Sequence, residues 1–368
     1  MVSLLITFFL GGLELTIAGT MGDLIAETFK WEGLAYFLLF SYLLGSVVGS
    51  FLFGYLVDSI GRKRGLEIGL VLFVLSSVAL AASSSPLMVL LLLFVQGFAI
   101  GGDSVAAGPM IIEGIRQRAK AFVVVSTTWF LGDLFAAVLG VFLTSELSYN
   151  AWRAGFAIAG AIVVPFAIVR FFIRESGVWE KYGRRKVKIS KGIRLFAVLL
   201  AVSVIDTVIS YAFPFVVLPD LVSPYLGLSA VEGTEFVDYA IMAATVASIV
   251  GGYTVVTFLI DRLKRKHAMV LGHAYMFTSF VAMTVAVLLR SPIGIIALFG
   301  ALSFLSPLGM FAVSLVAVEA FPASLRGKVN GVISGVSSVF SALTPLVIYS
   351  LASALNAVTA TALMAGLA

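Results

Sequence analysis

The chain is a succession of apolar runs separated by short polar segments. A helix that crosses about 30 Å of hydrocarbon needs about 20 residues, so the pattern predicts eleven membrane-spanning helices. The expected ranges are 3–22, 33–57, 65–83, 86–112, 120–144, 152–173, 193–218, 236–260, 268–289, 293–318 and 328–350. The last apolar run, from about Leu355 to Ala368, is shorter than a span requires, so we expect a twelfth helix that is short or truncated.

The composition supports the bilayer as the solvent of this chain. Of its 368 residues, 61% are hydrophobic and only 12% are charged, which no soluble core could accommodate. The basic residues lie in short loops rather than on one face, so the net charge of +5 indicates topology and not a nucleic-acid partner. The first run lacks a basic segment before it and a clear cleavage site, and we expect a retained first helix.

The distribution of Lys and Arg predicts the orientation. With the N-terminus inside, 21 of the 24 basic residues lie on the cytoplasmic side, and only Lys30, Arg153 and Arg290 lie opposite. We therefore expect a multi-pass protein of the cell membrane with a cytoplasmic N-terminus. The longest polar connection, 174–194, is strongly basic and falls midway, so we interpret residues 175–192 as a cytoplasmic linker between bundles at 1–174 and 193–368.

Two landmarks recur in both halves of the chain. Asp58 and Arg62 follow the second predicted helix, and Asp261 and Arg265 follow the eighth, 203 residues later. Glu113, after the fourth helix, has its counterpart 206 residues on, after the tenth. Nearly equal offsets indicate a duplicated six-helix unit, which is how many carriers build two bundles around a central site.

These motifs resemble those of the major facilitator superfamily. The segment Gly54-Tyr-Leu-Val-Asp58-Ser-Ile-Gly61-Arg62-Lys-Arg64 is similar to that family's loop between helices two and three. The segment Glu319-Ala-Phe-Pro-Ala-Ser-Leu-Arg326-Gly resembles the pattern after helix ten of the sugar-porter-like branch, and Arg174-Glu175-Ser176 resembles its stretch after helix six. The resemblance implies an all-α integral membrane protein with two pseudo-symmetric six-helix bundles. It also implies a secondary transporter, which we expect to act as a monomer.

Alternating access needs an ion-pair latch that holds in one state and breaks in the other. Charged and glycine positions at helix ends are placed for a cytoplasmic latch of this kind, and ten of them are candidates. They are Gly54, Asp58, Gly61, Arg62, Glu113, Glu175, Asp261, Arg265, Glu319 and Arg326.

Four acidic residues lie inside predicted helices, where an ionisable group costs about 2.5 kcal/mol or more, so each is a functional candidate. Glu14, Asp133 and Asp206 share a depth near the bilayer midplane, and Asp103 lies in the inner half. Glu14 resembles the first-helix acid of proton-coupled family members. Asp103 resembles the helix-four acid of phosphate and organic-anion symporters, and Asp206 resembles the helix-seven Asp of the phosphate symporters, whereas Asp133 has no family counterpart. Carboxyl groups in a cavity can take up and release protons, so we expect proton-coupled symport.

The solute is less constrained than the fold. No Lys or Arg is expected deep in a helix, so an anionic solute would find no counter-charge there. A sugar usually needs several amide side chains for hydrogen bonds, and only Gln96 lies well inside a helix. Acids beside Trp129, Tyr211 and Phe213 suit organic cations or weakly polar neutral compounds. Pro214, Pro307 and Pro345 are expected to interrupt helices seven, ten and eleven. A proton-driven exporter of organic cations or drugs, and a transporter-derived sensor, remain alternatives.

A membrane enzyme is not expected. The chain has no cysteine, and its two histidines, His267 and His273, lack partners at metal-ligand spacing. We therefore predict no metal and no cofactor, with protons as the coupling ion, and we expect only a small-molecule solute and the lipid bilayer as partners.

Overall fold

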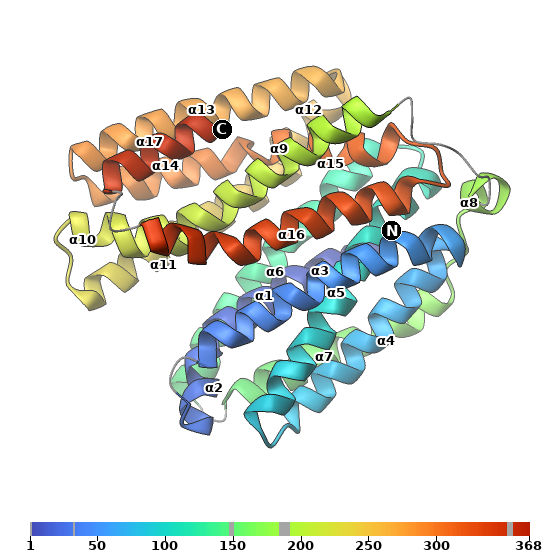
Figure 1. Ribbon diagram of the computed structural model, residues 1–368, viewed down its shortest axis with the longest axis horizontal. Coiled ribbons are helices and arrows are strands. Elements are labelled where there is room, and N and C mark those ends of the chain that lie inside the picture. Colours follow the sequence, from blue (N-terminus) through green and yellow to red (C-terminus); the bar gives the residue numbers. More distant parts are fainter. Residues whose placement is uncertain (1, 32–33, 147–150, 184–191, 352–355) are drawn as a thin grey trace. The chain divides into compact units, whose positions relative to one another are not determined.

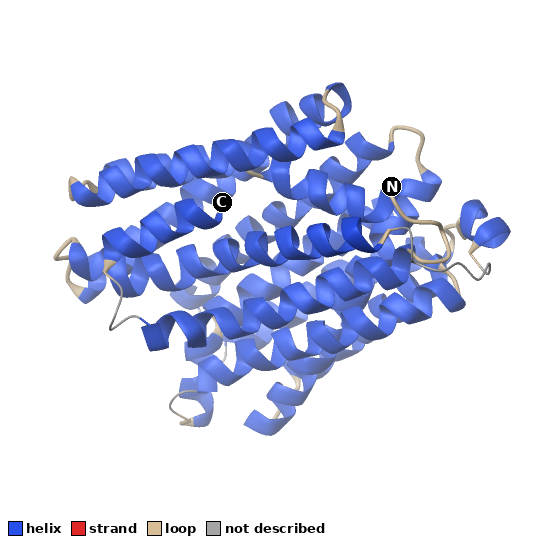
Figure 2. Ribbon diagram, turned by 45° about the horizontal axis from the view of Figure 1, so that its top comes forward, coloured by secondary structure: helices blue, strands red, loops and turns tan. Residues whose placement is uncertain are grey.

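The computed structural model describes residues 2–31, 34–146, 151–183, 192–351 and 356–368. Throughout these residues the regular structure is helical, and no strand occurs among them (Figure 2). The chain forms two compact units. Unit 1 comprises residues 1–196 and 317–339, and unit 2 comprises residues 197–316 and 340–368.

Unit 1 is built from long helices that pack in neighbouring pairs (Figure 1). The helix α1 packs on α6 and α7, α5 packs between α3 and α4, and α4 also contacts α7. The bounds are α1 (Val2–Thr20), α2 (Gly22–Phe29), α3 (Leu34–Ser59), α4 (Arg62–Ala81), α5 (Pro86–Gly114), α6 (Arg118–Glu146), α7 (Ala151–Phe171) and α8 (Gly177–Tyr182). Residues 326–339 of α16 (Arg326–Leu351) also belong to unit 1.

Small residues allow the helices of unit 1 to approach closely. A Cβ atom placed on Gly45 would lie 2.0 Å from the carbonyl oxygen of Phe94, and one on Gly49 would lie 2.1 Å from that of Phe98. Any side chain at these positions would therefore push α3 away from α5. Helices in membranes commonly associate through such contacts, because lipid gives them no hydrophobic driving force to pack.

Unit 2 contains the remaining helices, and its apolar core lies among η2, α11, α13, α14 and α17. The bounds are α9 (Ile193–Ala212), η2 (Phe213–Val222), α10 (Ser223–Tyr225), α11 (Ala230–Gly251), η3 (Gly252–Val256), α12 (Thr257–Arg262), α13 (Arg265–Leu288), α14 (Pro292–Leu305), α15 (Pro307–Glu319) and α17 (Ala357–Leu367). The segments η2 and η3 are π-helical, and such insertions often accompany functional sites.

Length and composition agree with a membrane location. Nine helices within the described residues are long and apolar enough to cross a bilayer. Many large apolar side chains on them or directly beside them are exposed. Ile293 on α14 and Phe172, which directly follows α7, are each more than four-fifths accessible. In water such a surface would be unfavourable, whereas in lipid it is the expected exterior.

The predicted helices form with ends shifted by a few residues. The short final helix also forms, as the 11-residue α17. Two of the three predicted helix interruptions occur: α9 ends at Ala212 and Pro214 lies in the π-helical η2, and α14 ends just before Pro307. The predicted interruption at Pro345 is wrong, because α16 continues through it. The division into 1–174, 175–192 and 193–368 stays a prediction, and the basic residues 184–191 of the linker lie outside the described residues.

Candidate functional sites

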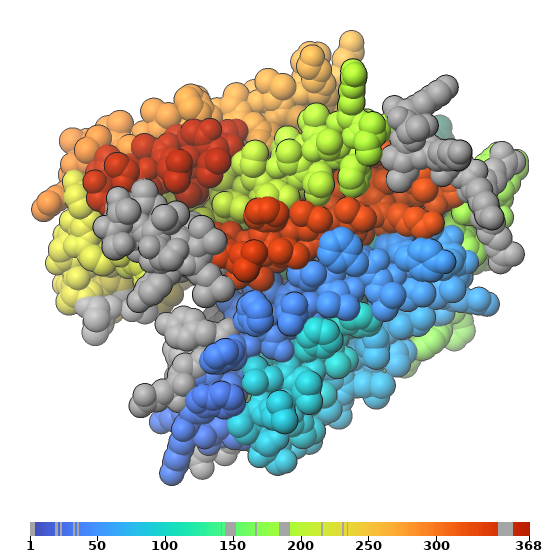
Figure 3. All heavy atoms as spheres, viewed as in Figure 1, coloured from blue at the N-terminus to red at the C-terminus, as the bar shows by residue number. Residues whose placement is uncertain are grey.

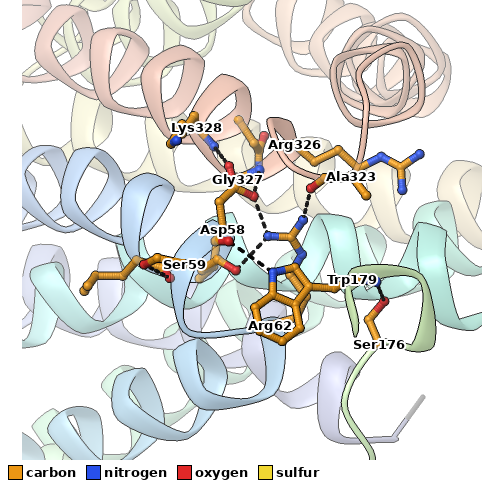
Figure 4. Close-up of polar contacts among 12 residues, drawn as sticks. Asp58, Ser59, Arg62, Ser176, Trp179, Ala323, Arg326, Gly327 and Lys328 are labelled. Carbon is orange, nitrogen blue, oxygen red and sulfur yellow. Dashed lines mark hydrogen bonds and ion pairs between the residues drawn. The ribbon is translucent and has the colours of Figure 1, made fainter. Parts of the chain in front are cut away.

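The turn between α3 and α4 buries an ion pair. Arg62 donates through Nη1 to Asp58 Oδ1 and, at 2.8 Å, to the carbonyl oxygen of Val57. Its other terminal nitrogen donates to the carbonyl oxygen of Ala323, 261 residues away in sequence. Because the guanidinium is fully buried, these partners are what make its burial tolerable. Figure 4 shows Arg62 held between Asp58 and Ala323.

Asp58 also caps the first turn of α16. Its Oδ1 accepts from the backbone N–H of Gly327 at 3.0 Å, and its Oδ2 accepts from that of Lys328 at 2.9 Å (Figure 4). A carboxylate at a helix N-terminus satisfies free N–H groups and complements the helix dipole. One aspartate therefore joins the end of α3, the start of α4 and the start of α16.

Glycines bring α3 and α16 into backbone contact beside this cap. A Cβ atom on Gly54 would lie 2.9 Å from the Cα atom of Gly331 and 3.0 Å from the carbonyl oxygen of Gly327. The atoms of α3, in blue, and of α16, in orange-red, touch in the space-filling view (Figure 3). A larger residue at Gly54 cannot be accommodated by rotating a side chain, because the obstructing atoms belong to the backbone.

Glu113, at the end of α5, accepts from two arginines and a serine. Its Oε1 lies 3.4 Å from Arg62 Nη2 and 3.1 Å from Arg326 Nη1, and its Oε2 accepts from the Ser176 hydroxyl. The side chain of Glu113 is fully buried. Without Glu113, the guanidinium groups of Arg62 and Arg326 would lose the carboxylate that they share and would repel each other.

Glu175 caps the N-terminus of α4. Its carboxylate accepts from the backbone N–H groups of Arg62 and Lys63, each at 3.1 Å. Gly61 precedes that helix with φ +115°, and a Cβ atom there would lie 2.1 Å from Glu175 Oε2. The glycine is required both for the backbone conformation and for the space that the carboxylate occupies. We name Asp58, Arg62, Glu113, Glu175 and Arg326 the Arg62 cluster.

The other predicted latch residues lie elsewhere. Glu319 pairs with Arg118, 3.1 Å from its Nε atom; the arginine side chain is exposed and that of Glu319 is mostly buried. Asp261 is exposed at the end of α12, and Arg265 donates to the carbonyl oxygen of Ile260 at 2.6 Å, as Arg62 does to that of Val57. The roles of all these residues in a latch stay predictions.

Glu14 lies on α1 and is fully buried. Within the described residues, neither of its carboxylate oxygens has a hydrogen-bond partner. On α6, by contrast, Asp133 accepts from the Thr16 hydroxyl at 2.9 Å and is partly exposed. The two acids predicted to share a depth thus have different surroundings.

Asp103 is neutralised by a buried arginine. Arg170, near the end of α7, donates through Nη1 to both oxygens of Asp103, at 2.7 and 2.9 Å. It also donates to the carbonyl oxygen of Leu66 and to the Thr7 hydroxyl. Arg170 stands in the last turn of α7, as expected for a basic residue near a helix end, but its side chain turns inward and joins α1, α4, α5 and α7.

Asp206 faces a histidine for which the sequence predicts no role. His273 Nε2, on α13, lies 3.1 Å from Asp206 Oδ1, on α9. The other ring nitrogen, Nδ1, lies 2.7 Å from the carbonyl oxygen of Met269. The two residues are 67 positions apart, so sequence spacing carries no signal of this pair.

The two remaining candidates occupy ordinary helical positions. Gln96 is buried in α5 and donates through Nε2 to the Ser77 hydroxyl at 2.9 Å, while its Oε1 has no partner among the described residues. Tyr211 is partly buried near the end of α9. Among the residues that the structure describes, no group of three acids or histidines could hold a metal ion.

A comparison with protein families decides the assignment. The family model of the Major Facilitator Superfamily matches residues 4–345. The chain belongs to the Major Facilitator Superfamily. It is thus a multi-pass membrane protein of a transporter family, which contains carriers and not enzymes.

Other members of the superfamily are similar over most of their length. A protein of Bacillus subtilis, named as a candidate niacin/nicotinamide transporter NiaP, is 26% identical over 347 residues, covering 90% of this chain and 80% of that protein. The cis,cis-muconate transport protein of Acinetobacter baylyi is 22% identical over 329 residues, covering 84% and 76%. The structure of the proton:xylose symporter XylE bound to 6-bromo-6-deoxy-D-glucose aligns with a TM-score of 0.80 at 16% identity, covering 99% and 93% of the two chains. That likeness confirms the predicted fold.

Proposed function

We propose that the protein is a proton-coupled symporter of a small neutral or cationic organic solute. The observation that carries this proposal is the carboxyl group of Glu14, which is fully buried and has no hydrogen-bond partner among the described residues. An ionised carboxylate in such surroundings is costly unless a cation or a proton accompanies it. Binding of a proton removes that cost, and its release requires water to reach the site.

This requirement can link proton binding to alternating access. The protonated carboxyl group of Glu14 is stable in the buried position, whereas the ionised carboxylate is favoured when the site opens to water. Because a ligand shifts a conformational equilibrium only by its differential affinity for the two states, a proton bound more tightly in one state can drive the cycle. The proton gradient would then set the direction of net solute movement.

The charges of unit 1 support a neutral or cationic solute. Two basic side chains, Arg62 and Arg170, are fully buried in the described part of unit 1. Arg62 is held by Asp58 and the carbonyl oxygen of Ala323, and the donors of Arg170 are taken by Asp103, Thr7 and Leu66. An anionic solute beside Glu14 and Asp133 would lack a counter-charge within the described part of this unit. Nicotinamide, part of the name of the Bacillus subtilis relative, is a neutral aromatic amide and fits this requirement.

The Arg62 cluster supplies the second element of the mechanism. We propose that it is the cytoplasmic latch, since the distribution of basic residues predicts that this end of the helices lies inside the cell. Its closed form joins residues 317–339 to the end of α3 through the cap that Asp58 forms on α16 and through Glu113. Opening toward the cytoplasm requires these contacts to break and re-form in each cycle.

The proposal can be tested with purified protein in liposomes. Uptake of radiolabelled nicotinamide, nicotinate and xylose is measured with the external side acidic, with no gradient, and with the lumen acidic. We expect nicotinamide to accumulate only with the external side acidic. In Glu14→Gln, gradient-driven accumulation is lost while exchange of labelled for unlabelled solute continues, because the amide resembles the protonated acid and cannot release a proton.

The matched control is Glu67→Gln, which changes the same chemical group on α4 in a partly exposed pair with Lys63. It should accumulate nicotinamide as the unmodified protein does. Accumulation that is indifferent to the gradient would contradict proton coupling. Accumulation with the lumen acidic would instead indicate antiport, and survival of gradient-driven accumulation in Glu14→Gln would exclude the role of Glu14.

A further inference from the structure

The pair formed by Asp206 and His273 in unit 2 has an unusual hydrogen-bond arrangement. Both side chains lie within spans, with 6% of the Asp206 side chain and 19% of the His273 side chain exposed. His273 contacts two oxygen atoms, one through each ring nitrogen. The Met269 carbonyl oxygen can only accept, so Nδ1 must carry a hydrogen and donate to it.

That assignment constrains the other nitrogen. In a neutral imidazole with hydrogen on Nδ1, the Nε2 atom has only a lone pair. An ionised carboxylate oxygen also has only lone pairs, so a 3.1 Å contact between them would bring two acceptors together. The contact therefore contains one additional proton, either on Asp206, which then donates to Nε2, or on Nε2, which then donates to the carboxylate.

Few other charges act on this pair. On its own helices the titratable residues near it are Tyr211 and Tyr275, whose hydroxyl donates to the carbonyl oxygen of Ala301. The charged residues of α9 and α13 and of the adjoining α12 lie near one end, at Asp261, Arg262, Arg265, Lys266, His267 and Arg194.

The other elements packed on this part of α13 carry little charge. Gly309, on α15, lies against the His273 ring, and α15 has no ionisable residue before Glu319, about 15 Å further along the helix at 1.5 Å per residue. The helices α14 and α17, which also pack on α13, have no titratable side chain. No neighbouring ion within these elements can replace the proton at this contact.

We propose that Asp206 and His273 together form a proton-binding site that loads and releases one proton in each transport cycle, on a different unit from Glu14. In the loaded form the proton joins Oδ1 and Nε2. On release it passes to water, leaving Asp206 as a carboxylate and His273 as a neutral ring with hydrogen on Nδ1. No other bond changes and no electron is transferred. The unloaded pair repels and separates, so proton release is tied to movement of α13 relative to α9.

Magnetic resonance can test the site without knowledge of the solute. The chain has only two histidines, so His273 can be labelled selectively. When the His267→Gln variant is grown with nitrogen-15 histidine, the ring of His273 gives the single imidazole signal. His267 is exposed at the start of α13 and has no contact with the pair, so its replacement leaves the site unchanged.

From mildly acidic to mildly alkaline pH, we expect Nδ1 to stay protonated while Nε2 changes from a proton-sharing to a free nitrogen. In Asp206→Asn, which can still donate an N–H group to Nε2, this transition should move or disappear. An Nε2 signal that is constant with pH, or a transition unaffected by Asp206→Asn, would overturn the proposal.

The transport role rests on the proposed proton-coupled function and needs a second measurement. Nicotinamide exchange and gradient-driven accumulation are compared for Asp206→Asn, His273→Gln and the control His267→Gln. Both pair variants should retain exchange and lose accumulation, while the control retains both. Full accumulation in both pair variants, alongside its loss in Glu14→Gln, would overturn this inference and leave the proposed function intact. If accumulation by the unmodified protein does not depend on the proton gradient, the proposed function is wrong, and so is the transport role of the pair.

Discussion

A single methyl group at Gly54 should open the latch. The Cβ atom of Gly54→Ala would lie 2.9 Å from the Cα atom of Gly331, whereas ordinary contacts begin near 3.4 Å. The helices α3 and α16 must therefore move apart by about half an ångström. The caps that Asp58 forms on Gly327 and Lys328, now 3.0 and 2.9 Å long, would then approach the limit of a hydrogen bond.

The expected magnitude follows from the cost of overpacking. Inserting a methyl group into a close contact that cannot relax costs about 1–3 kcal/mol. If the contact exists only in the latch-closed state, this cost shifts the equilibrium toward the open state by about 5-fold to about 150-fold. If the contact exists in every folded state, the same cost lowers the stability of the fold instead.

A thiol can distinguish these outcomes. The chain has no cysteine, so Ser324→Cys introduces one reactive group, at a position that is 6% exposed beside the Arg62 cluster. Its rate of reaction with a maleimide reports the fraction of open molecules. In the Gly54→Ala background we expect the rate to rise by the factor given above, with little change in the midpoint of thermal unfolding.

The matched control is Gly114→Ala, since a Cβ atom on Gly114 meets no other atom within 4 Å. It should leave the reaction rate unchanged. An unchanged rate in Gly54→Ala would refute the steric argument. A raised rate that appears only together with a lower unfolding midpoint would show that the contact belongs to the fold and is not a latch.

Three further experiments test the ion pairs and caps through the stability of the detergent-solubilised protein. Glu113→Ala should lower the free energy of unfolding by about 3–5 kcal/mol, because it removes a buried acid from two arginines, and Glu67→Ala in a partly exposed, solvated pair should change it by less than about 1 kcal/mol; equal effects would contradict the buried network. Gly61→Ala should cost about 1–3 kcal/mol, from positive φ and from collision with Glu175; a neutral result would refute both reasons. Asp103→Leu alone should destabilise strongly, and adding Arg170→Met should restore most of the loss; a double variant no better than the single one would contradict the pairing.

Much of the fold and part of the Arg62 cluster could be predicted from the sequence. Apolar runs of span length fix the helices because the bilayer leaves few alternatives to them. Asp58 and Arg62 stand four residues apart around a turn, so their contact is local and their motif is visible. The duplicated motif also led to Glu113, although its contact with Arg326 crosses 213 positions.

The missed features depend on contacts that spacing does not reveal. Arg170 lies at the end of a helix, where a long basic side chain commonly extends toward the interface, yet it turns inward to Asp103. The partner of Asp206 is a histidine on a helix without acids, and only packing of α13 beside α9 brings them together. Pro214 signalled an interruption but not the π-helical form of η2, which depends on how freed backbone groups find partners.

A proton-coupled symporter must move solute and proton together. The most direct test is to add nicotinamide to weakly buffered liposomes that contain the unmodified protein or Glu14→Gln, without an imposed gradient, and to record the external pH. We predict that the unmodified protein makes the outside more alkaline as nicotinamide enters, in proportion to the solute taken up, and that Glu14→Gln gives no pH change while still exchanging solute. Entry of nicotinamide through the unmodified protein with no change in external pH would contradict proton-coupled symport.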